Sequence, residues 1–294
     1  MTGAGGFVGS WLTAHLAANG DEVVAIDREV DVTDGKAVGD AITAASPDVV
    51  YHLAALTHVG RSWQDPGRVL QVNAMGTLYV LEAARACHPQ PRVLVTSSAE
   101  VYGAVPEDRL PVTEDAPLAP VTPYAASKVA AEFLGVQQHL AYDLPVIRSR
   151  PFNHVGPGQA SAFVVAALAE RIVHARKTGS SVIHVGNLTA RRDLTDVRDV
   201  VRAYRMLAQH GIAGEVYNVC TGRDIAIEEV ALRMQKLAGV ELRLELDPSL
   251  ARPVDVPVVR GDPSKLKEAT GWEPEFDLDE TLRAVLDQWD EKVG

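Results

Sequence analysis

The chain has 294 residues, of which 47% are hydrophobic and 23% charged, enough for a large α/β unit with an appended lobe. Its formal net charge is −11 without any basic block, which argues against nucleic acid as a partner. No apolar run approaches membrane-spanning length and no signal peptide is visible, so we expect a cytoplasmic protein without a membrane partner. Cys87 and Cys220 lie in apolar contexts, which predicts buried thiols in a reducing compartment.

The first feature along the chain is a glycine loop, Gly3-x-x-Gly6-x-x-Gly9. Glycines at this spacing let the backbone approach a pyrophosphate and direct helix N-terminal amides at it. Alone the loop is weak evidence, because glycine also serves ordinary turns. Such a loop normally follows a central strand of about five or six residues, whereas only Met1 and Thr2 come before Gly3. We expect a start assigned too far downstream or a shortened chain, with a compromised protein as the alternative.

Apolar runs and helical periodicity then alternate through the first 150 residues. The pattern predicts helices over 8–19, from about 34, over 66–87 and over 124–142, and strands over 22–27, 48–54, 92–98 and 144–150. This alternation favours a Rossmann-type, doubly wound parallel sheet. We expect residues 1–150 to form an NAD(P)-binding domain, to which about 195–219 return. Residues 151–294, which begin with an irregular loop over 151–158, would mainly form a smaller C-terminal α/β substrate-binding lobe.

A tyrosine and a lysine, Tyr124 and Lys128, lie four residues apart in the helix predicted over 124–142, so they share one face of it. A nearby ammonium favours phenolate and would bring the tyrosine pKa, about 10 when free, toward the working range. Ser98, at the end of a neighbouring strand, could hold a substrate oxygen against the phenol. In combination with the glycine loop, this arrangement indicates hydride chemistry at a carbon that bears oxygen. The proline-rich residues 107–123 are expected to form a loop over this site.

Cofactor choice depends on the end of the second predicted strand, where Asp27 is placed to bond the adenosine ribose hydroxyls. A carboxylate there repels a 2′-phosphate and favours NAD(H). The neighbouring Arg28 offsets part of that repulsion, so NADP(H) is possible. Asp31 and Val32 are placed to reach the adenine edge, with a solvated turn as an equal alternative.

Six motifs carry a resemblance that covers nearly the whole chain. They are Gly3-x-x-Gly6-x-x-Gly9, His52-Leu53-Ala54-Ala55, Asn73-x-x-Gly76-Thr77, Ser97-Ser98-Ala99-Glu100-Val101-Tyr102-Gly103, Tyr124-x-x-x-Lys128 and Arg150-Pro151-Phe152-Asn153. Together they resemble the extended short-chain dehydrogenase/reductase enzymes, the NAD-dependent epimerase/dehydratase family, which act on nucleotide sugars. Within it, the segments 150–159, 186–188, 192–199 and 252–257 most resemble the subgroup that reduces a GDP-bound 4-keto-6-deoxy sugar.

The resemblance implies roles for individual residues. The catalytic set would be Ser98, Tyr124 and Lys128. The cofactor would be bound by Gly3, Gly6, Phe7, Val8, Gly9, Asp27, Arg28, Asp31, Val32, Leu53, Ala54, Ala55, Thr57, Asn73, Tyr124, Lys128 and Pro151. The nucleotide sugar would be bound by Ser98, Ala99, Glu100, Tyr124, Asn153, Phe163, Val164, Arg192, Arg252 and Asp255, with Asn153 and the two arginines on the diphosphate. An alternative for Arg192 is a surface pair with Asp193 or Asp196. No metal is expected.

The helices over 66–87 and 124–142 carry apolar residues on more than one face: Val69, Val72, Leu78, Leu81, Val129, Phe133, Leu134 and Val136. A sheet covers only one face of each helix, so we expect the surplus to be buried in a homodimer, which is also usual in the resembling family.

Three alternatives to a reductase stay open at this point. A 4,6-dehydratase needs an acid and a base at Ala99 and Glu100, and alanine cannot protonate a leaving hydroxyl. UDP-sugar 4-epimerases share the serine, tyrosine and lysine and are the strongest alternative. A dinucleotide-binding sensor without turnover is the third, although an intact catalytic set argues against it.

Overall fold

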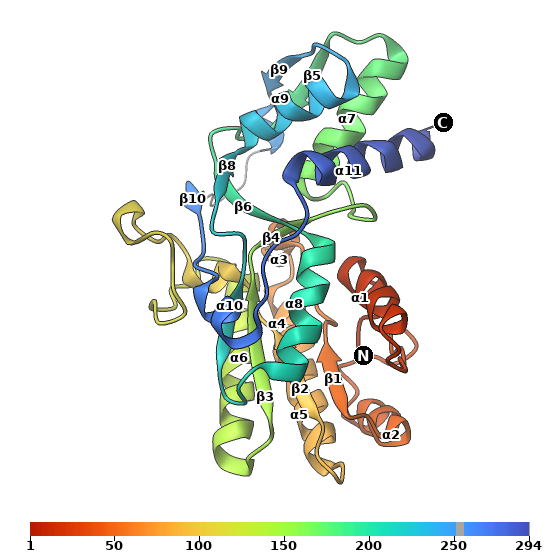
Figure 1. Ribbon diagram of the computed structural model, residues 1–294, viewed down its shortest axis with the longest axis vertical. Coiled ribbons are helices and arrows are strands. Elements are labelled where there is room, and N and C mark those ends of the chain that lie inside the picture. Colours follow the sequence, from red (N-terminus) through yellow and green to blue (C-terminus); the bar gives the residue numbers. More distant parts are fainter. Residues whose placement is uncertain (251–255, 294) are drawn as a thin grey trace.

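The computed structural model describes residues 1–250 and 256–293, and a parallel sheet occupies the lower half of the molecule (Figure 1). Its strands lie in the order β1 (Val49–His52), β2 (Arg92–Thr96), β3 (Val146–Pro151) and β7 (Val216–Val219). Each adjacent pair is parallel, with Val50 opposite Val93 and Leu94 opposite Ile147. Both faces of such a sheet must be covered, which explains the continuous apolar runs of these strands.

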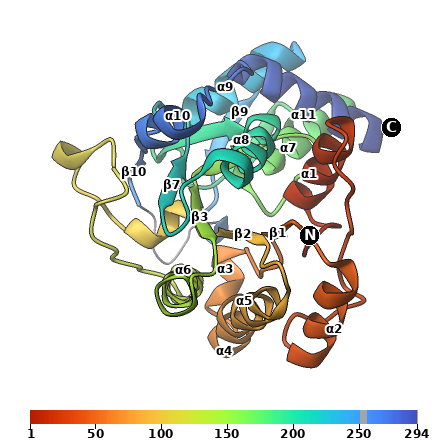
Figure 2. The same ribbon diagram turned by 60° about the horizontal axis from the view of Figure 1, so that its bottom comes forward.

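Helices cover the two faces of this sheet, as the end-on view shows (Figure 2). One face is covered by α1 (Phe7–Ala18) and α8 (Val197–His210), and the other by α2 (Gly35–Ala45), α5 (Gly76–Ala86) and α6 (Pro123–Tyr142). Side chains of β2 alternate between two cores: Leu94 packs with α1 and α8, whereas Val93 and Val95 pack with α2 and α5. The predicted doubly wound α/β architecture is therefore confirmed.

The predicted strand over 22–27 does not form, apart from one bridged residue. Thr2 pairs in parallel with Ile26 on one side and with His52 on the other. A ladder needs successive paired residues, whereas Thr2 and Ile26 form an isolated bridge, flanked by backbone hydrogen bonds of Ile26 with Met1 and Ala4. The sheet therefore continues past β1 through Thr2 to Ile26. The strand order reverses at Thr2, and at such a position α/β sheets bind ligands beyond the carboxyl ends of their strands.

The upper half of Figure 1 is a lobe built around a separate apolar core. Its elements are α7 (Val164–Thr178), β5 (Val182–Val185), α9 (Ile227–Ala238), β9 (Arg243–Leu246) and α11 (Leu278–Val293), with η4 (Pro248–Leu250) after β9. A small sheet lies between the lobe and the lower half; β4 (Asn153–Val155), β6 (Arg191–Asp196) and β10 (Val258–Val259) run parallel, and β8 (Asp224–Ala226) pairs antiparallel to β6. Residues 151–158, expected to be irregular, thus contain the strand β4. α10 (Ser264–Thr270) lies back on the lower half.

The helix predicted over 66–87 contains a wider turn at its centre. It consists of α4 (Pro66–Leu70), the π-helical turn η1 (Gln71–Met75) and α5, and it follows the short helix α3 (Val59–Ser62). The π turn carries Asn73, which is 1% exposed and bonds the backbone of Leu56 through both amide atoms. Its Nδ2 also donates to Ser127 Oγ in α6 at 2.9 Å. Turns of this kind often occur at functional sites, and this one joins the loop that follows β1 to α6.

The proline-rich segment expected over the site points away from it, at the left of Figure 1. Residues 104–122, which include η3 (Glu107–Arg109), contribute nothing to the cavity described below. The segment is held in this direction by Val112, whose backbone exchanges hydrogen bonds with Arg260 and Asp262, both at 2.9 Å.

The two thiols also differ from expectation, because Cys220 is buried whereas Cys87 is only half-buried. Of the helices in the described residues, none is long and apolar enough to cross a membrane.

Candidate active site

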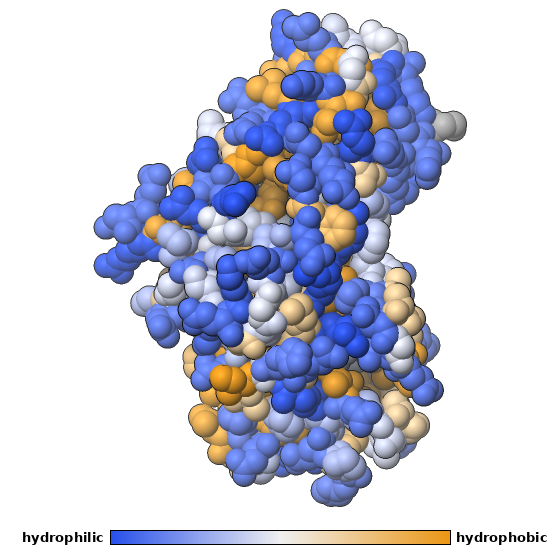
Figure 3. Space-filling view, viewed as in Figure 1, coloured by the Kyte–Doolittle hydropathy of each residue, from blue (hydrophilic) through white to orange (hydrophobic). Residues whose placement is uncertain are grey.

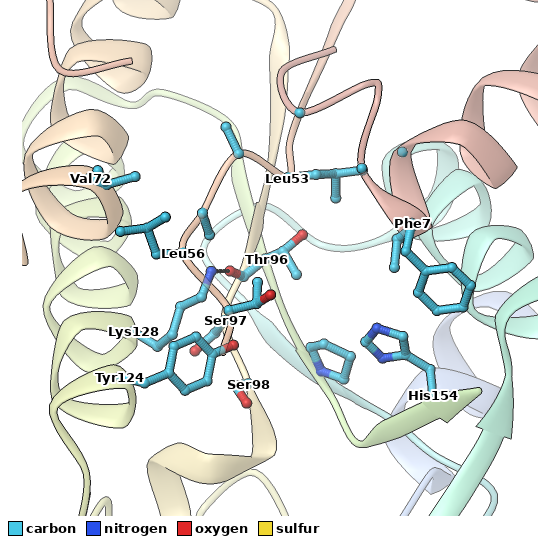
Figure 4. Close-up of a pocket in the computed structure, with 18 of the residues that line it drawn as sticks. Phe7, Leu53, Leu56, Val72, Thr96, Ser97, Ser98, Tyr124, Lys128 and His154 are labelled. Atoms are coloured by element: carbon cyan, nitrogen blue, oxygen red, sulfur yellow. Dashed lines mark hydrogen bonds between the residues drawn. The ribbon is translucent and has the colours of Figure 1, made fainter. Parts of the chain in front are cut away.

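A cavity of about 610 Å³ opens at the carboxyl ends of the parallel strands, between the lower half and the lobe (Figure 4). The glycine loop, the ends of β1, β2 and β3, one face of α6 and the start of β4 all contribute to its wall. It is formed where the strand order reverses, which is where this kind of sheet binds its ligand. The fold therefore brings together segments that are far apart in the sequence.

The glycine loop fits a dinucleotide on its own geometry. Gly3 has φ of +71°, a conformation that residues with a side chain rarely adopt. A Cβ on Gly9 would lie 2.1 Å from the carbonyl oxygen of Gly3, so only glycine lets α1 start this close to the loop. The N-terminus of α1 thus faces the cavity with its first amides, as a pyrophosphate requires.

The end of the cavity beside the glycine loop carries two acids and two arginines. Asp27 lies against the Cα of Gly5, and Arg28 lines the same wall. Asp31 also lines the cavity, and its Oδ1 accepts hydrogen bonds from the backbone and hydroxyl of Thr33, which forms a local turn. Arg68, which the motifs did not single out, lies 3.6 Å from Asp31 and adds a second positive charge.

Tyr124, Lys128 and Ser98 converge on one side of the cavity (Figure 4). The helix α6 begins here because Thr122 caps it, accepting from the amide of Ala125 at 3.0 Å, and Pro123 occupies its first turn. Ser98 caps the 3₁₀ turn η2 (Ala99–Tyr102) and accepts from the amide of Glu100 at 3.2 Å. The ammonium of Lys128 donates to the Thr96 carbonyl at 2.8 Å.

The electrostatics differ from the sequence-based expectation. Burial raises the pKa of Tyr124 to about 12; the Ser98 hydroxyl opposes this shift and the Glu100 charge adds to it. Burial also lowers the pKa of Lys128 to about 8. Lys128 therefore does not lower the pKa of the phenol as predicted. Desolvation is the largest influence on the pKa of both groups, and the ammonium is hydrogen-bonded to the Thr96 carbonyl of β2. Tyr124 is a protonated phenol at neutral pH in this state.

Most residues assigned from sequence line this one cavity. They are Gly3, Gly6, Phe7, Val8, Gly9, Asp27, Arg28, Asp31, Val32, Leu53, Ala54, Ala55, Thr57, Ser98, Ala99, Glu100, Tyr124, Lys128, Pro151, Asn153 and Phe163. Three others lie elsewhere. Asn73 supports the cavity wall from behind, Val164 packs against the core of the lobe, and Arg192 is 9% exposed in β6, where its Nη1 donates to the carbonyls of Arg191 and Pro257. Arg252 and Asp255 lie outside the described residues.

Further residues line the cavity although the sequence assigned them no role: Gly5, Ile26, Val30, Leu56, Val59, Arg68, Val72, Thr96, Ser97, Gly103, Phe152, His154, Gln159, Tyr204, Val256 and Val259. His154, in β4, bonds the carbonyl of Phe152 through Nδ1, and its ring stacks with Phe7 at 6.0 Å across the cavity. Tyr204 reaches the cavity floor from α8, where the sequence shows only a core position. Among the residues described, no group of three or more His, Cys, Asp or Glu is placed to hold a metal ion.

Comparison with known proteins gives the same picture. A family model described as GDP-mannose 4,6 dehydratase matches residues 28–285. A GDP-6-deoxy-D-mannose reductase of Pseudomonas aeruginosa is 39% identical over 296 residues, covering 100% of this chain and 97% of the relative.

Solved structures agree. RMD from Pseudomonas aeruginosa complexed with NADPH superposes with a TM-score of 0.89 at 40% identity, covering 99% of this chain and 97% of the other. A Thermus thermophilus UDP-glucose 4-epimerase in complex with NAD has a TM-score of 0.87 at 32% identity, covering 98% of this chain and 97% of the other. The chain therefore belongs to the GDP-mannose 4,6 dehydratase family of extended short-chain dehydrogenase/reductase enzymes.

Proposed function

We propose that the protein reduces a nucleotide-bound 4-keto-6-deoxy sugar with a nicotinamide dinucleotide, converting GDP-4-keto-6-deoxy-D-mannose to GDP-D-rhamnose. The observation that carries this proposal is the convergence of Ser98, Tyr124 and Lys128 in one cavity with a glycine loop, in a chain 39% identical to a GDP-6-deoxy-D-mannose reductase. When bound, the reduced nicotinamide supplies the hydride.

The chain's own residues would supply the proton and the orientation. Ser98 donates a hydrogen bond to the sugar carbonyl oxygen and holds it beside the phenol. Tyr124, protonated at neutral pH, gives its proton to that oxygen as negative charge develops there. Lys128 faces the same space, and its ammonium stabilises the phenolate that remains. Buried walls exclude water from the exchange.

The cofactor would extend from the reacting centre to the glycine loop. Its pyrophosphate would meet Gly3, Gly6, Phe7, Val8 and Gly9. Its adenosine would meet Asp27, Arg28, Asp31 and Val32, and its nicotinamide half Leu53, Ala54, Ala55, Thr57 and Pro151. Asn73 would act from behind the wall by holding Leu56 in place.

We further propose that residues 151–294 mainly form the nucleotide-sugar lobe, while 195–219 belong with the cofactor-binding part of residues 1–150. The lobe would contribute Asn153, Phe163, Val164, Arg192, Arg252 and Asp255 to the sugar nucleotide. Ala99 and Glu100, on the turn after Ser98, would contact the sugar itself. The buried, apolar Ala99 offers no acid for water elimination, which favours a reductase over a dehydratase.

A substrate comparison tests the proposed reaction. We expect GDP-4-keto-6-deoxymannose to cause stoichiometric loss of NADH absorbance and GDP-mannose to cause none, because a reductase needs a ready-made ketone. An epimerase or dehydratase returns the hydride to the same sugar and consumes no cofactor. Conversion of UDP-glucose to UDP-galactose without loss of absorbance would contradict the proposal and establish the epimerase. Cofactor binding with no product from any nucleotide sugar would indicate a sensor.

Cofactor preference gives a second test. We expect NADH to be preferred, because Asp27 repels a 2′-phosphate, and Asp27→Ala to narrow or reverse the preference. Arg28 and Arg68 line the same end of the cavity and oppose this repulsion, and the relative from Pseudomonas aeruginosa was solved with NADPH. Titrating both cofactors against wild type, Asp27→Ala and a control Asp40→Ala on the exposed face of α2 separates these influences. A wild-type preference for NADPH would show that the arginines outweigh the carboxylate.

We also propose that the protein is a homodimer whose interface includes α6. On this helix Phe133 is 56% exposed and Leu140 is 76% exposed, and hydrophobic side chains reach the surface over α6 in Figure 3. Three of the residues first assigned to this surplus, Val69, Val72 and Leu81, are instead buried within the protomer. We expect light scattering at micromolar concentration to give twice the chain mass of 31.5 kDa, and Phe133→Glu to give the monomer. A wild-type monomer would contradict the proposal.

A further inference from the structure

Behind the cavity wall lies a buried polar cluster formed by Tyr102, Glu132, Arg150 and Asn218, here called the Arg150 cluster. None of these residues is more than 4% exposed, and none lines the cavity. Arg150 Nε and Nη2 donate to the two carboxylate oxygens of Glu132 at 3.1 and 2.5 Å. Its Nη1 donates to the Tyr102 hydroxyl at 2.8 Å, which in turn donates to Asn218 Oδ1 at 2.7 Å.

Three members of the cluster, Glu132, Arg150 and Tyr102, are a short distance along the chain from a residue of the active site. Glu132 lies one helical turn after Lys128 in α6, on the same side as Tyr124. Arg150 directly precedes Pro151 in β3. Tyr102 ends the turn η2, which Ser98 caps and which carries Glu100. The cluster therefore connects the three elements that bring catalytic groups to the cavity.

The Tyr102 hydroxyl makes the two hydrogen bonds that join η2 to the rest of the cluster. Burial raises the pKa of this phenol to about 12, so it is a neutral group that can accept from the guanidinium and donate to the amide. Its ring also contacts Phe152, 6.4 Å away, and the Arg150 guanidinium, 4.9 Å from the ring centre. Removing only the hydroxyl would thus keep these ring contacts and remove the two hydrogen bonds that fix the direction of the end of η2.

A purely stabilising role explains this arrangement poorly. A buried ion pair recovers its desolvation cost only with good geometry and further hydrogen bonds, and an apolar replacement is often equally stable. The two-oxygen contact between Arg150 and Glu132 instead fixes the plane of the guanidinium, so that Nη1 donates to the Tyr102 hydroxyl and to the Glu114 carbonyl, 3.0 Å away. The first of these two hydrogen bonds ends on η2.

We propose that Tyr102 is a positioning residue for the reduction, holding η2 so that Ser98 and Glu100 keep their orientation relative to Tyr124 and Lys128. The inference rests on the proposed function for its kinetic consequence. Small displacements of a positioned group lower turnover strongly, about 10²-fold for 1 Å. The glycine loop and Asp27 do not touch the cluster, so cofactor affinity should not change.

The first measurement is a double-mutant cycle between Tyr102→Phe and Ser98→Ala. We expect Tyr102→Phe to lower kcat about tenfold with an unchanged Kd for NADH, and to have no further effect when Ser98 is already alanine. The matched control is Tyr217→Phe, which removes another buried tyrosine hydroxyl, one that accepts from the amide of Ile212 at 3.0 Å. It should leave kcat unchanged. Additive effects in the cycle, or equal losses in the two tyrosine variants, would overturn the proposal.

The second measurement does not depend on the substrate. The amides of Val101 and Gly103 donate to the carbonyls of Ser98 and Glu100 within η2, each at 3.2 Å. Hydrogen exchange at these amides should be faster in Tyr102→Phe than in Tyr217→Phe and wild type. NADH titration of each protein would measure the fraction of molecules that are folded and bind cofactor. Unchanged exchange would overturn the positioning role. If the wild type fails to reduce the keto sugar while Tyr102→Phe still shows faster exchange than wild type, the proposed function would be contradicted and the positioning role supported.

Discussion

Replacing Tyr124 by phenylalanine should lower kcat by about 10²–10⁴-fold while leaving the Kd for NADH nearly unchanged. The phenol is the proton donor in the proposed reaction, and general acid catalysis contributes a factor of this size. The fully buried ring would stay in place, because its packing does not depend on the hydroxyl. Steady-state kinetics with the keto sugar, combined with fluorescence titration of the cofactor, would measure both quantities.

A matched control for this variant is Tyr142→Phe. Tyr142 ends the same helix but is 46% exposed and lies outside the cavity, so its replacement should leave turnover unchanged. If Tyr124→Phe kept near-normal kcat, the central assignment of this site would be wrong.

Lys128→Met should also abolish most turnover, and it should weaken cofactor binding as well, since the resembling family uses this amine to bond the nicotinamide ribose. Burial lowers the pKa of Lys128 to about 8, so its positive charge is present below that pH and is lost as pH rises through it. Wild-type kcat/KM should therefore fall above about pH 8, and the residual activity of the variant should lack this fall. A control, Lys265→Met, removes a lysine outside the cavity that pairs with Glu215.

The same substitution makes a prediction about stability. The pKa of this lysine is lower in the folded state than in the unfolded chain, so between about pH 8 and 10 the unfolded state binds more protons. At neutral pH the buried ammonium of Lys128 therefore lowers the free energy of unfolding, and Lys128→Met should unfold at an equal or higher temperature than wild type. If the unfolding temperature of the wild type did not change between about pH 7 and 9, or if Lys128→Met were strongly destabilised, the lowered pKa of Lys128 would be contradicted.

The local parts of the site were predictable because their signals are local. The spacing of Tyr124 and Lys128 specifies a shared helical face, and Thr122 with Pro123 specifies where that helix begins. The glycine loop likewise encodes its own backbone conformation. These features depend on neighbours within one or two turns, so periodicity and capping chemistry suffice to identify them.

The remaining features depend on contacts between distant segments. Whether residues 22–27 form a strand is decided by the chain beside them, and the direction of residues 104–122 by the hydrogen bonds of Val112. Tyr204 reaches the cavity from the opposite face of the sheet, which no spacing reveals. The phenol pKa was misjudged for a related reason, since spacing places a lysine near a tyrosine but does not measure how deeply both are buried.

The route of the chain between the two halves limits how this enzyme can be rebuilt. After β3 the chain passes into the lobe, returns as α8 and β7, leaves again for β8 and α9, and returns once more at α10 before α11 (Figure 1). A single junction at residue 151 exchanges β7 together with the lobe, so a lobe taken from a relative would bring a foreign strand to pair with β3. Exchange of specificity that keeps the native sheet therefore needs a junction at each crossing, or changes in individual loops at the cavity mouth.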